Sequence, residues 1–192
     1  MRSDMANTVG YHVVKSAYGL WLPGDDRGHW SSAWDEQIGY YEPGMLHGGD
    51  PVRERMARER MKFAPLRWDV RMQQIIAATI DRCQRESAWS ISAAAIEPTH
   101  FHLLITYSGR DIYATMKWVA QQITKAVHRD MGTAQPVFCE GRWISVIYDN
   151  EHWDNTRGYI ERHNERRGVG AKPFAWVGRG KCKARDGIAG RI

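Results

Sequence analysis

The sequence has few cysteines, three in 192 residues, and this scarcity limits the kinds of fold that are available to it. Cys83, Cys139 and Cys182 are widely separated and form no CxxC pair. An odd number of isolated cysteines argues against a disulfide framework and against a zinc ribbon. We therefore expect a fold held by its hydrophobic core, in which Cys83 is a small apolar residue of a helix.

Long apolar runs are also absent. No stretch approaches the ~20 apolar residues of a membrane-spanning helix. The opening MRSDMANTVG carries both charge signs and lacks the apolar centre of a signal peptide. Hydrophobic residues make up 43% of the chain and charged residues 26%, as in ordinary folded domains. The sequence predicts a cytoplasmic protein without a membrane partner, built as one domain with appendages.

The net charge of +5 is concentrated near the C-terminus. Residues 165–192 contain eight Lys and Arg against two acidic residues, so the rest of the chain is close to neutral. Clustered cations bind nucleic acid because they release condensed counterions. We expect a domain at 1–164 and a basic tail at 165–192, the alternative for the tail being a solvated, disordered segment. The tail residues selected as DNA contacts are Arg166, Arg167 and Lys172.

Hydrophobic patterning predicts strands interleaved with helices. Strands rich in β-branched and aromatic residues are expected at 11–22, 89–96, 100–107 and 142–148. Helices are expected at 53–62, 68–86, 110–130 and 150–164, the last with Asn150 as its N-cap. The order lacks regular βαβ repeats, so we predict an α+β domain in which helices pack on an antiparallel sheet.

A long polar loop at 23–50 and the helix that follows it are candidate binding elements. Loops of this length are usually functional, and aromatic side chains in them can stack on unpaired bases. The aromatic residues of the loop are Trp30, Trp34, Tyr40 and Tyr41, whereas His29 and His47 lack a partner at ligand spacing. The helix is either solvated or in contact with DNA. Its basic residues are Arg53, Arg55, Arg58, Arg60 and Lys62.

His100 and His102 lie two positions apart in the strand at 100–107. Residues with this spacing point to the same face of a sheet, so the two imidazoles can share a metal ion. Phe101 and Leu103 point the other way and would anchor the strand in the core. A His-x-His pair also arises by chance, and the pair alone is a weak signal.

Tyr159 and His163 lie four residues apart in the last expected helix and therefore share a face. His163 could join the first two histidines in a site with open positions, where a metal polarises a phosphate oxygen. Tyrosine is a suitable nucleophile because it forms covalent intermediates. A packed aromatic residue and a charge at a helix C-terminus are the alternatives.

These residues resemble the motifs of a known family. The run Ile96–Ile105, IEPTHFHLLI, is similar to the strand motif of the HUH transposases, and Tyr159-Ile160 with the polar residues after it resembles their catalytic helix. The opening YHVVKSAYGLWLPGDDRGHW is similar to the first strand and loop of the single-tyrosine members. Those members are insertion-sequence transposases and REP-associated tyrosine transposases. The resemblance spans roughly residues 10–165.

The resemblance implies a ferredoxin-like or RRM-like HUH endonuclease fold and gives each site residue a role. His100 and His102 would bind Mg²⁺ or Mn²⁺, and Tyr159 would attack the scissile phosphate. The third ligand corresponds best to His163. Here the chain departs from the REP-associated pattern, which commonly has Asn-Pro where this sequence has His163-Asn164.

The resemblance implies cleavage and rejoining of single-stranded DNA at hairpins through a 5′-phosphotyrosine, in the cytoplasm of a bacterium and at its nucleoid. Family members often act as dimers, so a homodimer is one possible assembly of this protein. Two other functions also stay open: a DNA-binding module, domesticated or without catalysis, and a phosphodiesterase that uses the metal and a water molecule. Of the three functions, only cleavage and rejoining through a phosphotyrosine requires Tyr159.

Overall fold

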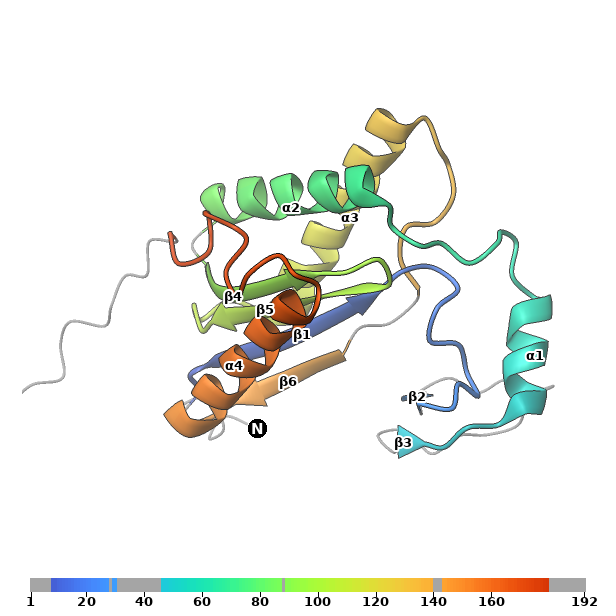
Figure 1. Ribbon diagram of the computed structural model, residues 1–192, viewed down its shortest axis with the longest axis horizontal. Helices are drawn as coiled ribbons and strands as arrows, with labels where there is room; N and C mark the ends of the chain where they lie inside the picture. Colours follow the sequence, from blue (N-terminus) through green and yellow to red (C-terminus); the bar gives the residue numbers. More distant parts are fainter. Residues whose placement is uncertain (1–7, 28, 31–45, 88, 140–142, 180–192) are drawn as a thin grey trace, which may run out of the picture.

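The main sheet of the protein has four antiparallel strands, and helices lie on both of its faces. The computed structural model describes residues 8–27, 29–30, 46–87, 89–139 and 143–179. The strands are β1 (Gly10–Ser16), β4 (Ser90–Ile96), β5 (His100–Thr106) and β6 (Trp143–Ile147), in the order β4-β5-β1-β6. The helices that alternate with them or follow them are α2 (Val70–Arg85), α3 (Ile112–Met131) and α4 (Asn150–Arg166) (Figure 1).

The connectivity from β1 to β6 is βαββαβ, which together with this strand order is the ferredoxin-like arrangement. The predicted α+β architecture with an antiparallel sheet is therefore confirmed. The expected β4–β5 hairpin is confirmed too, with Ile96 paired to Phe101 and Ser90 to Thr106.

The segment between β1 and α2 leads away from the sheet. The strands β2 (His29–Trp30) and β3 (Leu46–His47) form a short antiparallel pair, and α1 (Pro51–Glu59) follows. Figure 1 shows these elements beside one another, at the end of the molecule away from α4. The side chain of Trp30 and all of Trp34, Tyr40 and Tyr41 lie outside the described residues, as does the tail from 180 onward.

Two expected boundaries differ from the structure. The first strand ends at Ser16 and not at 22, because Gly19 and Trp21 have φ values of 71° and 63°, in the left-handed region that a strand cannot contain. The cap of α4 is Asp149 rather than Asn150. The Asp149 side chain accepts a hydrogen bond from the His152 backbone N–H at 2.7 Å. An aspartate also favours the positive end of the helix dipole.

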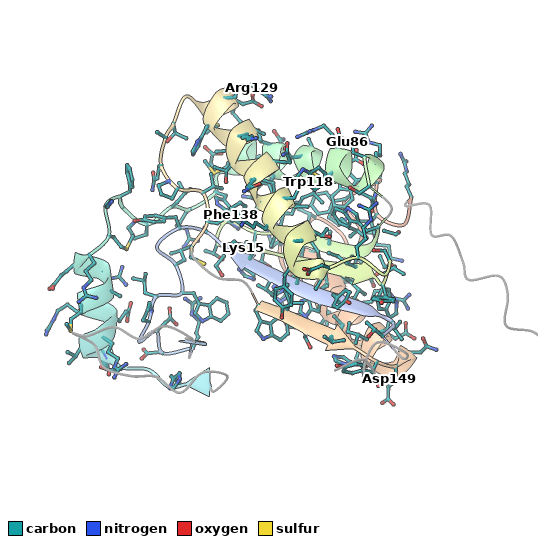
Figure 2. The ribbon with its side chains drawn as sticks, turned by 180° about the vertical axis from the view of Figure 1, so that it is seen from behind. Lys15, Glu86, Trp118, Arg129, Phe138 and Asp149 are labelled. Atoms are coloured by element: carbon teal, nitrogen blue, oxygen red, sulfur yellow. The ribbon has the colours of Figure 1, made fainter. Side chains whose placement is uncertain are left out.

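The main hydrophobic core fills the space between the sheet and the α2–α3 pair. In β5, Phe101, Leu103 and Ile105 point into this core and are at most 2% exposed. Figure 2, viewed from behind, shows α3 crossing this face of the sheet. Among the described helices, none combines the length and the apolar character that a membrane crossing requires.

A smaller core lies on the opposite face of the sheet, under α4. Its buried members are Ala93, Ala95, Leu104, Ile147 and Ile160. The alanines leave room for the helix, and the Asn164 side chain donates a hydrogen bond to the Ala94 carbonyl at 2.9 Å. A helix with few apolar residues is thus held by a close fit and by hydrogen bonds to the backbone of β4.

The chain turns back after α4 and packs on the domain. Asn164 also donates to the carbonyl of Ala171, and the Gly178 N–H donates to the Ile91 carbonyl, with N···O distances of 2.9 and 2.8 Å. Phe174 and Trp176 pack against the main core. Helix α4 extends past the expected boundary at 165 to Arg166, and these contacts connect the residues that follow it to the sheet. The division into a domain and a basic tail stays a prediction.

The close approach of α4 to β1 depends on the absence of a side chain at Gly10. A Cβ atom there would meet the Ile105 carbonyl and the ring of Trp153 on α4. We predict that Gly10→Ala lowers the free energy of unfolding by ~1–3 kcal/mol, because a packed interface must open. Urea denaturation measures the change. As a control, Gly158→Ala in the middle of α4 meets only the end of the Arg162 side chain and should raise stability by up to ~1 kcal/mol. Equal effects at both positions would contradict this account of α4 docking.

Candidate active site

Two elements bring three histidines together on the α4 face of the sheet. His100 and His102 begin β5 and point to the side opposite Phe101, as their spacing predicted. His163 projects toward them from the last turns of α4. One ligand nitrogen from each of the three lies within 4.8 Å of the other two. The expected juxtaposition of the β5 pair with His163 is therefore present in the structure.

Each of the three imidazoles is held through its Nδ1 atom. His100 Nδ1 lies 2.8 Å from the Thr99 hydroxyl oxygen, and His163 Nδ1 lies 2.5 Å from a carboxylate oxygen of Glu97. His102 Nδ1 lies 3.0 Å from Nε2 of His12, which comes from β1. Such partners fix ring orientation and tautomer at metal sites.

The Nε2 atoms of the rings are not used by these orienting partners. Those of His100 and His102 are 2.8 Å apart, so without a metal one of them donates a hydrogen bond to the other. The Nε2 atom of His163 is buried and has no hydrogen-bond partner among the described residues. A buried nitrogen without a partner is costly, and a cation beside it would remove that cost.

Burial favours the neutral form of three imidazoles at this site, those of His12, His100 and His102. It lowers the pKa of His102 to about 2, helped by the nearby His100, His12 and His163. Burial also lowers the pKa of His12 to about 4 and lowers the pKa of His100, in the latter case against the opposing effect of Glu97. Neutral imidazole is the form that binds a metal. His100, His102 and His163 therefore form a donor set that could hold a metal ion.

Tyr159 lies next to this cluster, one helical turn before His163. Its ring centroid is 4.6 Å from that of His163, 5.5 Å from His102 and 6.0 Å from His12. The side chain is 39% exposed, whereas His102 is 4% exposed. A phenol at the mouth of a buried nitrogen cluster can reach both the cluster and a molecule that arrives from solvent.

Three residues of this site were missed in the sequence: His12, Glu97 and Thr99. Glu97 and Thr99 directly precede the histidine pair, on either side of Pro98. Proximity to candidate ligands was an available signal for both. His12 carried no such signal, because its contact with His102 depends on how β1 aligns with β5, where Val14 is opposite His102.

The basic residues expected to bind DNA on α1 are largely engaged with acidic neighbours. Arg53 pairs with Asp50 at 2.9 Å, Arg58 pairs with Glu54, and Arg55 lies 4.0 Å from Glu59. Arg60 and Lys62 follow the helix. These surface pairs contribute little stability, so they do not prevent the arginines from binding phosphate. Their role in DNA contact stays a prediction.

The tail residues differ in their surroundings. Arg166 is exposed at the end of α4. Arg167 donates hydrogen bonds to the Ile96 carbonyl and, at 2.7 Å, to Gln73, so it links α4 to β4 and α2. Lys172 lies 3.6 Å from Glu161. The contacts of Arg167 explain its presence structurally, without reference to DNA.

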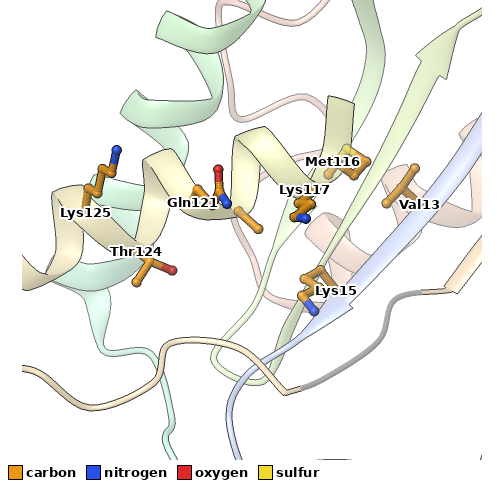
Figure 3. Close-up of a pocket in the computed structure, with 8 residues that line it drawn as sticks. Val13, Lys15, Met116, Lys117, Gln121, Thr124 and Lys125 are labelled. Carbon is orange, nitrogen blue, oxygen red and sulfur yellow. The ribbon is translucent and has the colours of Figure 1, made fainter. Parts of the chain in front are cut away.

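A separate hollow lies on the other face of the sheet, between β1 and α3. It has a volume of about 380 Å³ and an apolar floor that includes Val13 and Met116. Figure 3 shows Lys15 on β1 and Lys117 and Lys125 on α3 around it. The sequence analysis did not select these lysines, although Lys117 and Lys125 are two helical turns apart and so share a face.

The fold and the site together define an α+β protein with a candidate three-histidine metal centre beside a partly exposed tyrosine. No protein-family model and no curated protein matches the chain. Among solved structures, the chain is similar to a REP-associated tyrosine transposase bound to a REP hairpin, with a TM-score of 0.47 and 13% identity. The similarity covers 84% of this chain and 70% of that chain. At this level of similarity, nothing about activity follows.

The buried histidines predict how stability depends on pH in the absence of metal. The pKa values of His12 and His102 in the folded protein, about 4 and about 2, lie below the ordinary 6.5. The unfolded chain therefore binds more protons below pH 6.5, and stability should fall as the pH drops from 6.5 toward 4. His12 alone corresponds to ~3 kcal/mol over its full range, at ~1.4 kcal/mol per pKa unit.

Urea denaturation in the presence of a chelator, at several pH values between 7 and 5, measures this effect. His12→Gln and His102→Gln each remove one of the titrating groups. Both variants should lose less stability than the original protein over the same range. A protein that keeps its stability down to pH 5 would show that these imidazoles are not buried in the neutral form.

Proposed function

We propose that this protein cleaves and rejoins single-stranded DNA through a covalent 5′-phosphotyrosine. Tyr159 is the nucleophile, and His100, His102 and His163 hold a divalent metal. The observation that carries the proposal is the position of Tyr159, on the same helical face as one ligand and in ring contact with another. The resemblance of IEPTHFHLLI and of the Tyr159 helix to the HUH transposase motifs supports it.

The proposed chemistry is a transesterification in two steps. The Tyr159 oxygen forms a bond to phosphorus as the bond to the 3′-oxygen breaks. The phenol loses its proton and the departing 3′-oxygen gains one, so the charges balance. A second 3′-hydroxyl later attacks the phosphotyrosine and restores both groups. A metal held by these three histidines would supply Lewis-acid polarisation of the phosphate.

The protein's own contribution is to hold these groups in place. β5 is an interior strand of the sheet, paired on both sides by β1 and β4, so its two histidines have a rigid support. The Glu97 carboxylate orients His163. Because Asn164 and Arg167 fasten the end of α4 to β4, the turn that carries Tyr159 is held against the histidines.

The DNA partner is proposed to be a hairpin with unpaired flanking bases. The family resemblance and the separate basic regions support this partner. Those regions are α1, the end of α4 and the lysine-lined hollow beside α3. Cations on different faces suit a folded DNA that extends beyond the scissile phosphate. We keep the homodimer as an expectation from the resemblance.

The first test is trapping of the covalent intermediate. Single-stranded hairpin oligonucleotides carrying a 3′-end label are incubated with the protein and Mn²⁺, then denatured and separated by electrophoresis. The label should move with the protein, because the tyrosine would join the 5′ end of the downstream fragment. Tyr159→Phe should abolish both the adduct and cleavage. Tyr148→Phe, at a tyrosine that is 51% exposed, should change neither and serves as the matched control.

Two outcomes would contradict the proposal. Cleavage that survives Tyr159→Phe would identify a hydrolase in which water is the nucleophile. Transfer of a 5′-end label to the protein, in place of the 3′-end label, would show the opposite polarity of attack. A protein that binds the oligonucleotide and never cleaves it would be a binding module.

The second test concerns the metal. Magnesium prefers oxygen ligands, whereas imidazole suits transition metals, so the three nitrogens favour Mn²⁺ over Mg²⁺. We expect isothermal titration calorimetry to give an affinity for Mn²⁺ at least ~10-fold above that for Mg²⁺. Glu97→Gln should weaken Mn²⁺ binding ~10–100-fold, since it removes the charge that orients His163.

His128→Ala is the control for the metal test. That histidine belongs to α3 and bonds to the Gln135 carbonyl, on the other face of the sheet. Its loss should leave Mn²⁺ affinity unchanged. Equal affinity for both metals, or equal weakening by Glu97→Gln and His128→Ala, would contradict the assignment of the ligands.

A further inference from the structure

Trp143 is a large apolar side chain left partly uncovered beside the candidate site. It begins β6 and is 42% exposed, whereas Trp68 and Trp89 are at most 3% exposed in the main core. In the sheet formed by the described strands β6 is at the edge, so Trp143 has β1 as its neighbouring strand. Exposed aromatic side chains next to a site often mark a binding surface.

The register of the sheet places Trp143 on the same face as the histidine cluster. It is opposite Val14 in β1, and Ser145, two residues later, is opposite His12. The Trp143 ring meets the His12 ring edge-on, with centroids 5.0 Å apart. This contact shows that the Trp143 side chain points to the face of the sheet that carries His12.

The side chains of Trp143 and Tyr159 lie near each other, with His12 between them. Both rings contact the same imidazole, since the His12 ring lies 6.0 Å from that of Tyr159 and 5.0 Å from that of Trp143. Helix α4 covers the other end of β6, where Ile147 is fully buried in the smaller core. Among the described residues, the end of β6 that carries Trp143 is therefore a partly accessible region of this face beside the tyrosine.

We propose that Trp143 is a stacking platform for an unpaired nucleobase that lies one or two nucleotides from the phosphate attacked by Tyr159. The inference rests on the proposed function and adds a specific contact to it. A planar indole gives base stacking at little cost in side-chain entropy, and stacking tolerates any base because every base has a π face. A tryptophan here would select unpaired strands, since the bases of a duplex already stack on each other.

The test combines protein variants with abasic DNA. All proteins carry Tyr159→Phe, so that binding is measured without cleavage, and affinity is followed by fluorescence anisotropy of a labelled hairpin oligonucleotide with Mn²⁺. Trp143→Ala should weaken binding about 10-fold or more, and Trp143→Phe less than about 3-fold, because phenylalanine keeps a stacking face. Tyr113→Ala is the matched control, since Tyr113 is 52% exposed and belongs to α3, on the other face of the sheet. Its effect should be small.

Abasic substitution at each position along the oligonucleotide then locates the stacked base. At one position, removal of the base should weaken binding to the protein that retains Trp143, and should have no further effect on the Trp143→Ala protein. Such coupling is the sign of a direct contact. Loss of affinity that is the same for every abasic oligonucleotide would overturn the inference, as would unchanged affinity of Trp143→Ala.

Two further results separate this inference from neighbouring ones. Trp143→Ala could convert a dimer into a monomer in sedimentation experiments, with no coupling to any base. In that case Trp143 lies in the interface with a second copy of the chain, and the inference fails. If the coupling is found while the original protein forms no adduct, base stacking is supported and the proposed nucleophile fails. Thermal unfolding of Trp143→Ala checks that the variant is folded.

Discussion

The seating of α4 on the sheet is the constraint on which the site depends. β5 supplies two histidines, but Tyr159 and His163 reach them only if α4 lies close to the strands. The helix buries just Thr156, Ile160 and Asn164, so hydrophobic burial alone holds it weakly. Small residues at Gly10, Ala93 and Ala95 compensate by allowing a short separation. Hydrogen bonds from the end of α4 to the β4 backbone then fix its rotation, and with it the direction in which Tyr159 and His163 point.

The histidine cluster itself works against folding. Several imidazoles are withdrawn from water, and one Nε2 atom is left buried without a partner among the described groups. A protein selected for stability alone would fill this position with apolar side chains, because unsatisfied buried polar groups are destabilising. Burial instead favours the neutral form of His12, His100 and His102. Glu97, Thr99 and His12 orient the rings. That combination is understandable if a cation completes the site, since the same lone pairs then become ligands.

Much of the architecture could be predicted from the sequence because local signals were strong. Apolar periodicity located α2 and α3, and alternation in β5 placed His100 and His102 on one face and Phe101 on the other. What could not be predicted depends on long-range pairing. His12 meets His102 because of the alignment between strands 90 residues apart, and neither segment alone encodes it. The early end of β1 depends on left-handed residues, whose effect a hydrophobic pattern does not register.

One face of the sheet forms the main hydrophobic core and the other carries the candidate site. Strand β5 contributes side chains to both. Its odd-numbered residues secure the main core against α2 and α3, and its even-numbered residues begin with the two histidines. A one-residue shift of β5 would bury the imidazoles in the apolar core and expose Phe101. Because such a shift is unfavourable, β5 has one stable register. The packing that stabilises the domain therefore also determines where the candidate ligands lie. The three candidate ligands and Tyr159 lie together within one chain in this arrangement. A single copy therefore brings together the residues that the proposed chemistry uses.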